Sequence, residues 1–294
     1  MFTRLNTENF EAVTPFFERH RPSVCDNTIG AVFQWRDAYA TYFKIAGDML
    51  LIRARYGKDG DCYVFPLGCG DLRAALALCE QDAAMRNDEL RFCVLPNEAL
   101  TSLSEIYGDR LIYENRREWA DYLYDAESFR TFSGKRYHTQ KNHVNRFYRD
   151  NPYASCVPVT SELERACLDF LNAYAGEHVD MGLIERNELK GAADLLLRRE
   201  KLRQSAYCLQ IGGEVVALSI GELRFDTLYV HVEKALTRYS GAYPAMAQAF
   251  VRAHAGAQFV NREDDAGDEG LRYSKLNYKP IRLIDKFFAR ILPQ

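Results

Sequence analysis

Three consecutive apolar runs in the last third of the chain constrain its fold more than any other feature. They cover Ser205–Ile211, Glu214–Leu223 and Thr227–Ala235, and Gly212-Gly213 separates the first two. A two-residue Gly-Gly loop is a hairpin signal, because glycine adopts the positive φ that tight hairpin turns require. The sequence therefore predicts an antiparallel sheet in this part of the chain.

Helices and further strands are predicted on both sides of this sheet. The capping box Ser161-x-x-Glu164 predicts the start of a helix that Gly176 ends, and a second helix is expected over residues 185–199. After the sheet we expect a helix, a strand, a helix and a last strand. These four elements cover Ala242–Ala255, Gln258–Asn261, Leu271–Asn277 and Ile281–Phe288. This order resembles the element order of the GNAT acetyltransferase fold.

The first half of the chain shows a shorter version of the same plan. Its predicted strands cover Met49–Tyr56, Cys62–Leu67, Leu90–Leu95 and, as one or two strands, Arg110–Tyr124, with helices over residues 71–86 and 96–108. We therefore predict an α/β (α+β) protein with two tandem GNAT-like domains, each a mixed, mostly antiparallel sheet flanked by helices. The predicted parts are an N-terminal domain (1–130), a basic linking helix (131–152) and a C-terminal domain (153–294).

Charge and hydropathy argue against several classes of protein. The chain has 38 Lys and Arg residues against 41 Asp and Glu residues, and no DNA partner is expected, because non-specific DNA affinity comes from many cation–phosphate contacts. No stretch approaches the roughly 18 apolar residues of a membrane span, and the N-terminus lacks a signal-peptide pattern. We expect a cytoplasmic protein. The eight cysteines lack zinc-ligand spacing, so we expect no metal and no tightly bound cofactor.

A basic segment between Arg130 and Arg149 is the strongest local feature of the sequence. It contains six Lys or Arg residues, two histidines and no acidic residue. On a helix, its cations and amides would recur every three or four residues along one stripe, which suits a phosphate-bearing partner such as acyl-CoA, the acceptor end of a tRNA or an anionic lipid headgroup. A solvated helix that joins two domains would show the same pattern. The predicted donor phosphate-binding residues on this segment are Lys135, Arg136, Lys141, Asn142, Asn145 and Arg146.

A second candidate for phosphate binding lies between the predicted sheet and the following helix. Arg238, Gly241 and Tyr243 stand where a GNAT enzyme keeps its Arg/Gln-x-x-Gly-x-Gly/Ala pyrophosphate loop, with Tyr243 in place of the last small residue. Glycine at a helix N-terminus lets backbone N–H groups reach a phosphate. A single glycine at a helix start is also a common structural device.

Candidate catalytic residues lie on the last two strands of the predicted sheet. The period-two pattern places His231 and Glu233 on the same face of one strand, and Glu222 lies on the neighbouring strand. Such side chains accept protons from attacking amines or hydroxyls. Each of them is alternatively explained as a member of an ion pair with Lys234 or Arg224.

An acidic, Gly-rich run from Asn261 to Arg272 is the candidate acceptor-binding loop. It lacks the ligand spacing of an EF-hand, which argues against a metal. A loop that holds a cationic group fits better, and a surface turn that caps the next helix is the structural alternative. The predicted acceptor-binding residues in this run are Asn261, Arg262, Glu263 and Asp264.

Four motifs in one order resemble a bacterial family of uncharacterised proteins that share the C-terminal domain of phosphatidylglycerol lysyltransferases. They are Lys135–Phe147, His231-Val232-Glu233-Lys234-Ala235, Gly241-Ala242-Tyr243-Pro244 and the Asn261-Arg262-Glu263…Lys275…Tyr278…Pro280 stretch. The last motif adds Lys275 to the predicted acceptor-binding residues. In this chain Gln140-Lys141 replaces the more usual Lys-Arg pair, and Tyr273-Ser274 departs from the usual small or basic residues. We expect the transmembrane flippase region of the full-length lipid enzymes to be missing.

The resemblance implies a tandem GNAT-like fold and, for the lysyltransferase members, aminoacyl transfer from charged tRNA to a lipid headgroup. Our leading hypothesis is an acyl- or aminoacyl-transferase that takes its group from a phosphate-bearing co-substrate, either acyl-CoA or aminoacyl-tRNA, and passes it to a small amine or hydroxyl acceptor. The alternatives are a non-catalytic binding module for a nucleotide, tRNA or charged metabolite, and a scaffold without a small-molecule site.

Overall fold

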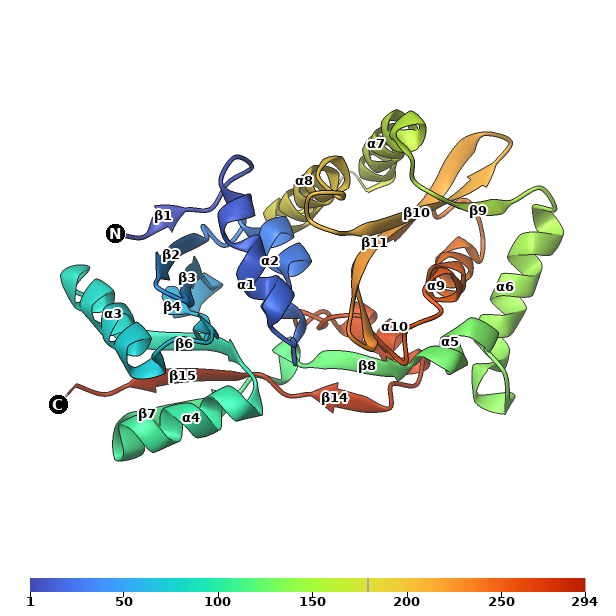
Figure 1. The fold of residues 1–294 in the computed structure, drawn as a ribbon. Coiled ribbons are helices and arrows are strands. Elements are labelled where there is room, and N and C mark those ends of the chain that lie inside the picture. Colours follow the sequence, from blue (N-terminus) through green and yellow to red (C-terminus); the bar gives the residue numbers. More distant parts are fainter. Residues whose placement is uncertain (179, 294) are drawn as a thin grey trace. The chain divides into compact units, whose positions relative to one another are not determined.

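The fold is drawn in Figure 1, a computed structural model that describes residues 1–178 and 180–293. Contacts divide the chain into two compact units. Unit 1 contains Met1–Asp121, Asp264–Gly267 and Ile284–Gln294, and unit 2 contains Tyr122–Glu263 and Asp268–Leu283. This division differs from the predicted boundaries at residues 130 and 152, because the chain returns twice to unit 1 after unit 2 has begun.

Unit 1 is built on an eight-stranded sheet with the order β1-β2-β3-β4-β6-β15-β7, in which β5 pairs with β3. The β4–β6 pair is parallel, and the other pairs described are antiparallel. The strands are β1 (Thr3–Arg4), β2 (Tyr42–Ala46), β3 (Met49–Arg55), β4 (Asp61–Tyr63), β5 (Leu67–Gly68), β6 (Leu90–Leu95), β7 (Leu111–Asn115) and β15 (Phe287–Ile291). The helices are α1 (Thr14–Arg19), α2 (Ile29–Trp35), α3 (Leu72–Met85) and α4 (Asn97–Tyr107).

Helices α3 and α4 bury their apolar faces against this sheet. Leu76 and Cys79 of α3 and Leu103 of α4 join one core cluster with residues of β3, β6 and β15. Asp71 caps α3, because its carboxylate accepts the backbone N–H of Ala74. The helix predicted over residues 71–86 therefore begins directly after Asp71.

A lysine lies fully inside unit 1. The Lys286 amine is 2.5 Å from an Asp26 oxygen, 2.6 Å from an Asp121 oxygen and 3.2 Å from the Cys25 sulfur, and Asp264 lies 3.5 Å away. Burial alone would lower the pKa of this amine, but the surrounding carboxylates raise it well above its ordinary value. The ammonium therefore neutralises acidic groups from three separate segments of the chain.

Unit 2 is built on a seven-stranded sheet with the order β14-β8-β13-β12-β11-β10-β9. The β12–β13 pair is parallel, and its other described pairs are antiparallel. The strands are β8 (Asp121–Asp125), β9 (Ser155–Pro158), β10 (Ser205–Ile211), β11 (Glu214–Arg224), β12 (Thr227–Ala235), β13 (Phe259–Asn261) and β14 (Arg282–Ile284). The helices are α5 (Ala126–Thr131), α6 (His138–Asp150), α7 (Ser161–Glu177), α8 (Leu183–Leu197), α9 (Ala242–Ala253) and α10 (Glu269–Asn277).

The predicted antiparallel hairpins are confirmed. Strand β11 pairs with β10 on one side and β12 on the other, and both residues of the Gly212-Gly213 loop have positive φ, +58° and +90°. Together with the first sheet and its helices, this arrangement confirms the predicted fold class of two mixed, mostly antiparallel sheets flanked by helices.

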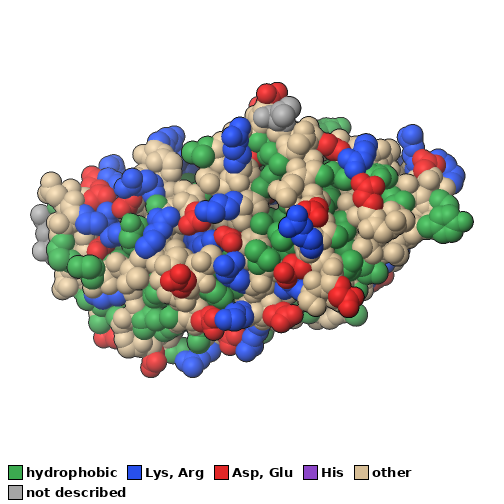
Figure 2. Space-filling model, turned by 90° about the horizontal axis from the view of Figure 1, so that it is seen from above, with side chains coloured by type: hydrophobic (Ala, Val, Ile, Leu, Met, Phe, Trp, Pro, Cys, Tyr) green, Lys and Arg blue, Asp and Glu red, His purple; other side chains and the backbone are tan. Residues whose placement is uncertain are grey.

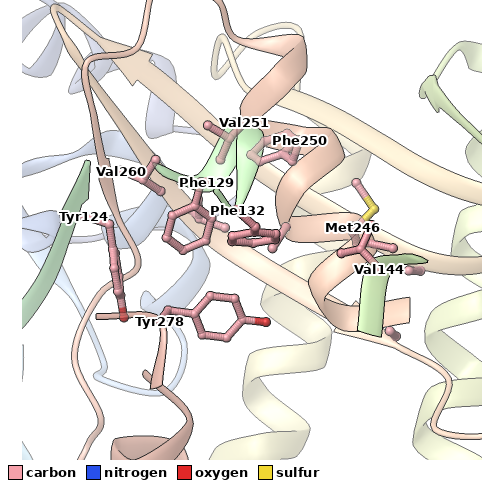
Figure 3. Packing of buried hydrophobic residues seen from close by; sticks show 14 of the residues in the cluster. Tyr124, Phe129, Phe132, Val144, Met246, Phe250, Val251, Val260 and Tyr278 are labelled. Carbon is pink, nitrogen blue, oxygen red and sulfur yellow. The ribbon is translucent and has the colours of Figure 1, made fainter. Parts of the chain in front are cut away.

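The core of unit 2 forms where α9 packs against α5, α6 and the sheet. Figure 3 shows Phe129 of α5 and Phe132, which follows that helix, beside Phe250 and Val251 of α9. Tyr278 stacks on Phe129 at 5.3 Å between ring centroids. Figure 1 shows α7 and α8 on the other side of the sheet from α9. The basic segment is thus part of a domain core, through the buried Val144 and Phe147 of α6, and is more than a linker.

Several predicted element bounds need correction. The run Arg110–Tyr124, predicted as one or two strands, forms two, and these strands, β7 and β8, belong to different sheets. The run Ile281–Phe288, predicted as one strand, divides into β14 and the start of β15. Polar and charged residues interrupt both runs. Thr160, with an extended backbone, is the N-cap of α7 in place of Ser161, and the helix continues past Gly176.

The described surface carries both signs of charge. On the face drawn in Figure 2, Lys and Arg side chains are interspersed with Asp and Glu. Among the helices of the described ranges, none is both long enough and apolar enough to cross a membrane.

Candidate functional site

A cavity of about 890 Å³ opens in unit 2, and all of its lining residues belong to that unit. Its walls come from five places: the basic segment with α6, Tyr174 of α7, the end of β12 with the loop after it, the start of α9, and α10 with the residues after it. Five tyrosines contribute to the lining, which is therefore rich in aromatic side chains. They are Tyr174, Tyr239, Tyr243, Tyr273 and Tyr278.

The basic segment reaches the cavity along a single stripe. Arg136, Thr139, Gln140 and His143 line the wall, and their spacing of three or four residues places them on one side of the segment. The helix itself begins at His138, after a 3-10 turn over Lys135–Tyr137. The predicted helical stripe is thus split, and only part of it faces the cavity.

The other predicted donor-binding residues of the basic segment are exposed and do not line the cavity. They are Lys135, Lys141, Asn142, Asn145 and Arg146. Arg146 is 3.4 Å from the Asp150 carboxylate, within the same helix. Of the predicted set on this segment, only Arg136 lines the cavity. Three exposed cations of this segment, Lys135, Lys141 and Arg146, thus lie outside the cavity lining, and we call them the α6 stripe.

The start of α9 approaches α6 closely at Gly241. This residue has φ +86°, and a Cβ atom built on it would lie 2.4 Å from the backbone oxygen of His143. The glycine is therefore explained by the packing of two helices. The N–H of Ala242 already donates to the Tyr239 carbonyl, and Pro244 has no N–H, so the first turn offers few donors to a pyrophosphate.

Substitution of Gly241 with alanine is expected to lower the free energy of unfolding by roughly 2–3 kcal/mol, through its left-handed backbone and its contact with His143. The matched control is Gly213→Ala, because Gly213 has φ +90° but a Cβ atom built on it would meet no other atom within 4 Å. The control should lose only about 1 kcal/mol. Urea unfolding followed by far-UV circular dichroism measures both, and equal losses would contradict the contact argument.

Glu233 is the one predicted catalytic residue that lines the cavity. Its carboxylate lies 2.5 Å from the guanidinium of Arg262, which stacks on the Tyr278 ring at 4.5 Å. Burial alone would lower the pKa of Arg262, but Glu233 and the nearby tyrosines raise it. Arg262 therefore stays cationic and fixes the position of the Glu233 carboxylate.

His231 and Glu222 are buried behind this pair and do not line the cavity. The imidazole Nδ1 of His231 is 2.8 Å from a Glu263 oxygen, and its Nε2 is 3.1 Å from a Glu222 oxygen. Burial alone would lower the pKa of His231, but the hydrogen bonds to Glu222 and Glu263 raise it to about 9. A protonated imidazole has no lone pair for a proton, so this geometry favours a supporting role over that of a base.

The remaining predicted residues are held in structural contacts. Arg238 is exposed and pairs with Glu177 and with Glu214. The Lys275 amine donates to the Arg262 carbonyl at 2.5 Å. The buried Asn261 accepts the N–H of Glu263.

Asp264 belongs to unit 1, where it lies near Lys286. The predicted acceptor-binding loop therefore does not line the cavity as one segment. Its Arg262 nevertheless pairs with Glu233, which does line the cavity.

Sequence reasoning missed much of the lining. Tyr174 of α7 lies 3.3 Å from Tyr243, hydroxyl to hydroxyl, and the Lys234 amine lies over the Tyr174 ring while pairing with Glu188 at 2.7 Å. Tyr273 and Asn277 complete the α10 wall. The only signal for the α10 wall was the spacing of its residues on one helix face, which is indistinguishable from an ordinary surface helix until the fold is known.

Comparisons with known proteins agree with the resemblance drawn from the four motifs. The sequence profile described as "Phosphatidylglycerol lysyltransferase, C-terminal" matches residues 17–290. A crystal structure of a conserved protein of unknown function from Bacteroides thetaiotaomicron VPI-5482 is 29% identical, with a TM-score of 0.89 over 99% of both chains.

Two further relatives are more distant. The C-terminal domain of a putative lysylphosphatidylglycerol synthetase from Agrobacterium fabrum is 13% identical, with a TM-score of 0.71 over 97% of this chain and 92% of that one, a likeness of fold alone. An uncharacterised protein of Mycoplasmoides gallisepticum is 25% identical over 191 residues, which are 63% of this chain. The match spans 60% of the length of that relative.

Proposed function

Because this chain belongs to the family of the phosphatidylglycerol lysyltransferase C-terminal domain, we propose that it transfers an aminoacyl group from charged tRNA to a small amine or hydroxyl acceptor. The acceptor and the aminoacyl end of the donor meet in the tyrosine-lined cavity of unit 2. The single observation that carries the proposal is the combination of this cavity, with Glu233 in its wall, and the exposed α6 stripe beside it.

The α6 stripe favours tRNA over CoA as the donor. CoA is small, and its pyrophosphate would depend on N–H groups at the start of α9. There the backbone of Gly241 packs against the His143 carbonyl, and the N–H of Ala242 already donates to the Tyr239 carbonyl. A tRNA extends well beyond the cavity, and its phosphates can contact cations that lie on the outer surface of α6. Lys135, Lys141 and Arg146 are such cations.

Glu233 is the residue that we assign to the acceptor. Its carboxylate can hydrogen-bond an attacking amine or hydroxyl and accept its proton as the new bond to the aminoacyl carbonyl carbon forms. The 3′-oxygen of the tRNA leaves with the electron pair of the broken ester bond and takes up a proton. No covalent intermediate is required, because the cavity brings donor and acceptor together.

A binding measurement tests the donor. Neutralising the α6 stripe as Lys135→Gln/Lys141→Gln/Arg146→Gln should weaken aminoacyl-tRNA binding and reduce the slope of log Kd against log salt by about 2–3, roughly 0.7–0.9 for each cation–phosphate pair removed. The control is Arg19→Gln/Lys58→Gln/Arg73→Gln, three exposed cations of unit 1.

The control should keep the wild-type slope. An equal change in both variants would show that only net charge matters. Binding of acetyl-CoA without any binding of aminoacyl-tRNA at low salt would overturn the assignment of the donor.

A further inference from the structure

A buried charge cluster of His231, Glu222 and Glu263 supplies no group that reacts in the proposed transfer step. His231 carries its proton between two carboxylates that come from different elements, Glu222 of β11 and Glu263 after β13. Glu222 also accepts the side-chain N–H of Gln204 at 3.1 Å and lies 4.0 Å from Arg224. Two carboxylates this close to one site repel each other unless a cation stays between them.

The backbone at Glu263 is in an unusual conformation. This residue has φ +57°, a region that residues with a Cβ seldom adopt, and its N–H donates to the Asn261 side chain. Such a conformation persists only where surrounding contacts hold it. The Glu263 carbonyl accepts the N–H of Tyr122, and its side chain is held by the hydrogen bond to His231.

This turn decides where Arg262 points. Because Arg262 and Glu263 are consecutive, the left-handed turn sends one side chain to Glu233 and the other to His231. The Arg262 carbonyl is fixed in addition by the Lys275 amine. The position of the cavity carboxylate therefore depends on a residue that does not touch the cavity.

We propose that His231 is a positioning residue: held between Glu222 and Glu263, it maintains the left-handed turn that presents Arg262 to the Glu233 carboxylate. Its effect on transfer rests on the proposed function of the cavity, whereas its effect on Arg262 does not. We call His231, Glu222 and Glu263 the buried clamp. It acts on the reaction through two successive charge pairs, His231–Glu263 and Arg262–Glu233, and contacts neither substrate.

The clamp has a defined dependence on pH. The pKa of His231 is about 9 in the folded protein against an ordinary value of 6.5. Its raised pKa contributes stability that is fully present below pH 6.5 and is lost as the pH rises through 9. Above that pH the neutral imidazole no longer balances Glu222 and Glu263, and we expect the turn to loosen.

The test follows the side-chain Nη–H signals of Arg262, whose Nη2 donates to Glu233, by ¹⁵N NMR, assigned with Arg262→Lys. In the wild type these signals should be protected from exchange below pH 9 and lost above it. In His231→Gln they should be exposed already at pH 7, and kcat/KM for transfer should fall about tenfold to hundredfold with little change in KM. The wild-type titration needs no substitution and stays informative if the variant fails to fold.

The matched control is His254→Gln, because His254 is another buried histidine of unit 2, whose Nδ1 contacts the Phe250 carbonyl of its own helix. This variant should leave the Arg262 signals unchanged. Protection of Arg262 that persists in His231→Gln and above pH 9 would overturn the inference and leave His231 a purely structural residue. If His231→Gln loses the protection of Arg262 but the wild type shows no transfer activity, the positioning role is sustained and the proposed function is refuted.

Discussion

Replacing Lys286 with methionine is expected to lower the free energy of unfolding of unit 1 by about 3–5 kcal/mol, the usual cost of removing one partner from a buried charge cluster. Methionine nearly preserves the volume of the side chain, so the loss comes from charge. Asp121 would remain fully buried without the ammonium that lies 2.6 Å away, and Asp26 would lose its ion pair at 2.5 Å.

Tryptophan fluorescence during urea unfolding measures this change selectively. The chain has two tryptophans, Trp35 and Trp119, and both belong to unit 1. The control Lys58→Met removes an exposed cation of the same unit and should change stability by less than about 0.5 kcal/mol. A loss below about 1 kcal/mol in Lys286→Met would show that the acidic groups rearrange at little cost and would contradict the prediction.

Replacing Glu233 with glutamine is expected to lower kcat for transfer by about 10²–10⁴-fold, the range that removal of a general base produces. The amide keeps the size of the side chain and its place in the cavity wall, but it does not accept a proton from the acceptor. Donor binding should change little, because the α6 stripe is untouched. Steady-state transfer rates and donor affinity measured on the same preparation separate the two effects.

The exposed Glu200 supplies the control, and Glu200→Gln should transfer at the wild-type rate. Thermal unfolding of Glu233→Gln must accompany the assay, because Arg262 loses its charged partner. A rate within threefold of the wild type would remove Glu233 from the chemistry. A wild-type protein that binds the donor without any turnover would favour the binding-module alternative.

Local patterns in the sequence predicted the fold well where neighbouring residues alone determine the structure. The Gly212-Gly213 loop and the apolar runs around it determine the hairpins, since register follows from turn geometry and from the buried face. The sequence did not show that Arg110–Tyr124 and Ile281–Phe288 each supply strands to two different sheets. Which sheet a strand joins depends on partners far away in the chain, and no local pattern carries that information.

The candidate site was predictable only in part for the same reason. Residue type identified Glu233 as an acid on a strand, but its partner Arg262 lies 29 positions away and is revealed only by the folded structure. Period two also placed His231 beside Glu233 without showing that two carboxylates enclose it. The tyrosine lining comes from three helices and a loop, and aromatic residues in such places are usually core.

The position of β15 determines when unit 1 can become complete during synthesis. Residues 287–291 lie between β6 and β7, so the sheet has a gap until this strand has left the ribosome. By then all of unit 2 has already emerged. The first unit to be made is thus the last to close, and a nascent chain must carry two unpaired strand edges while the whole of unit 2 is translated.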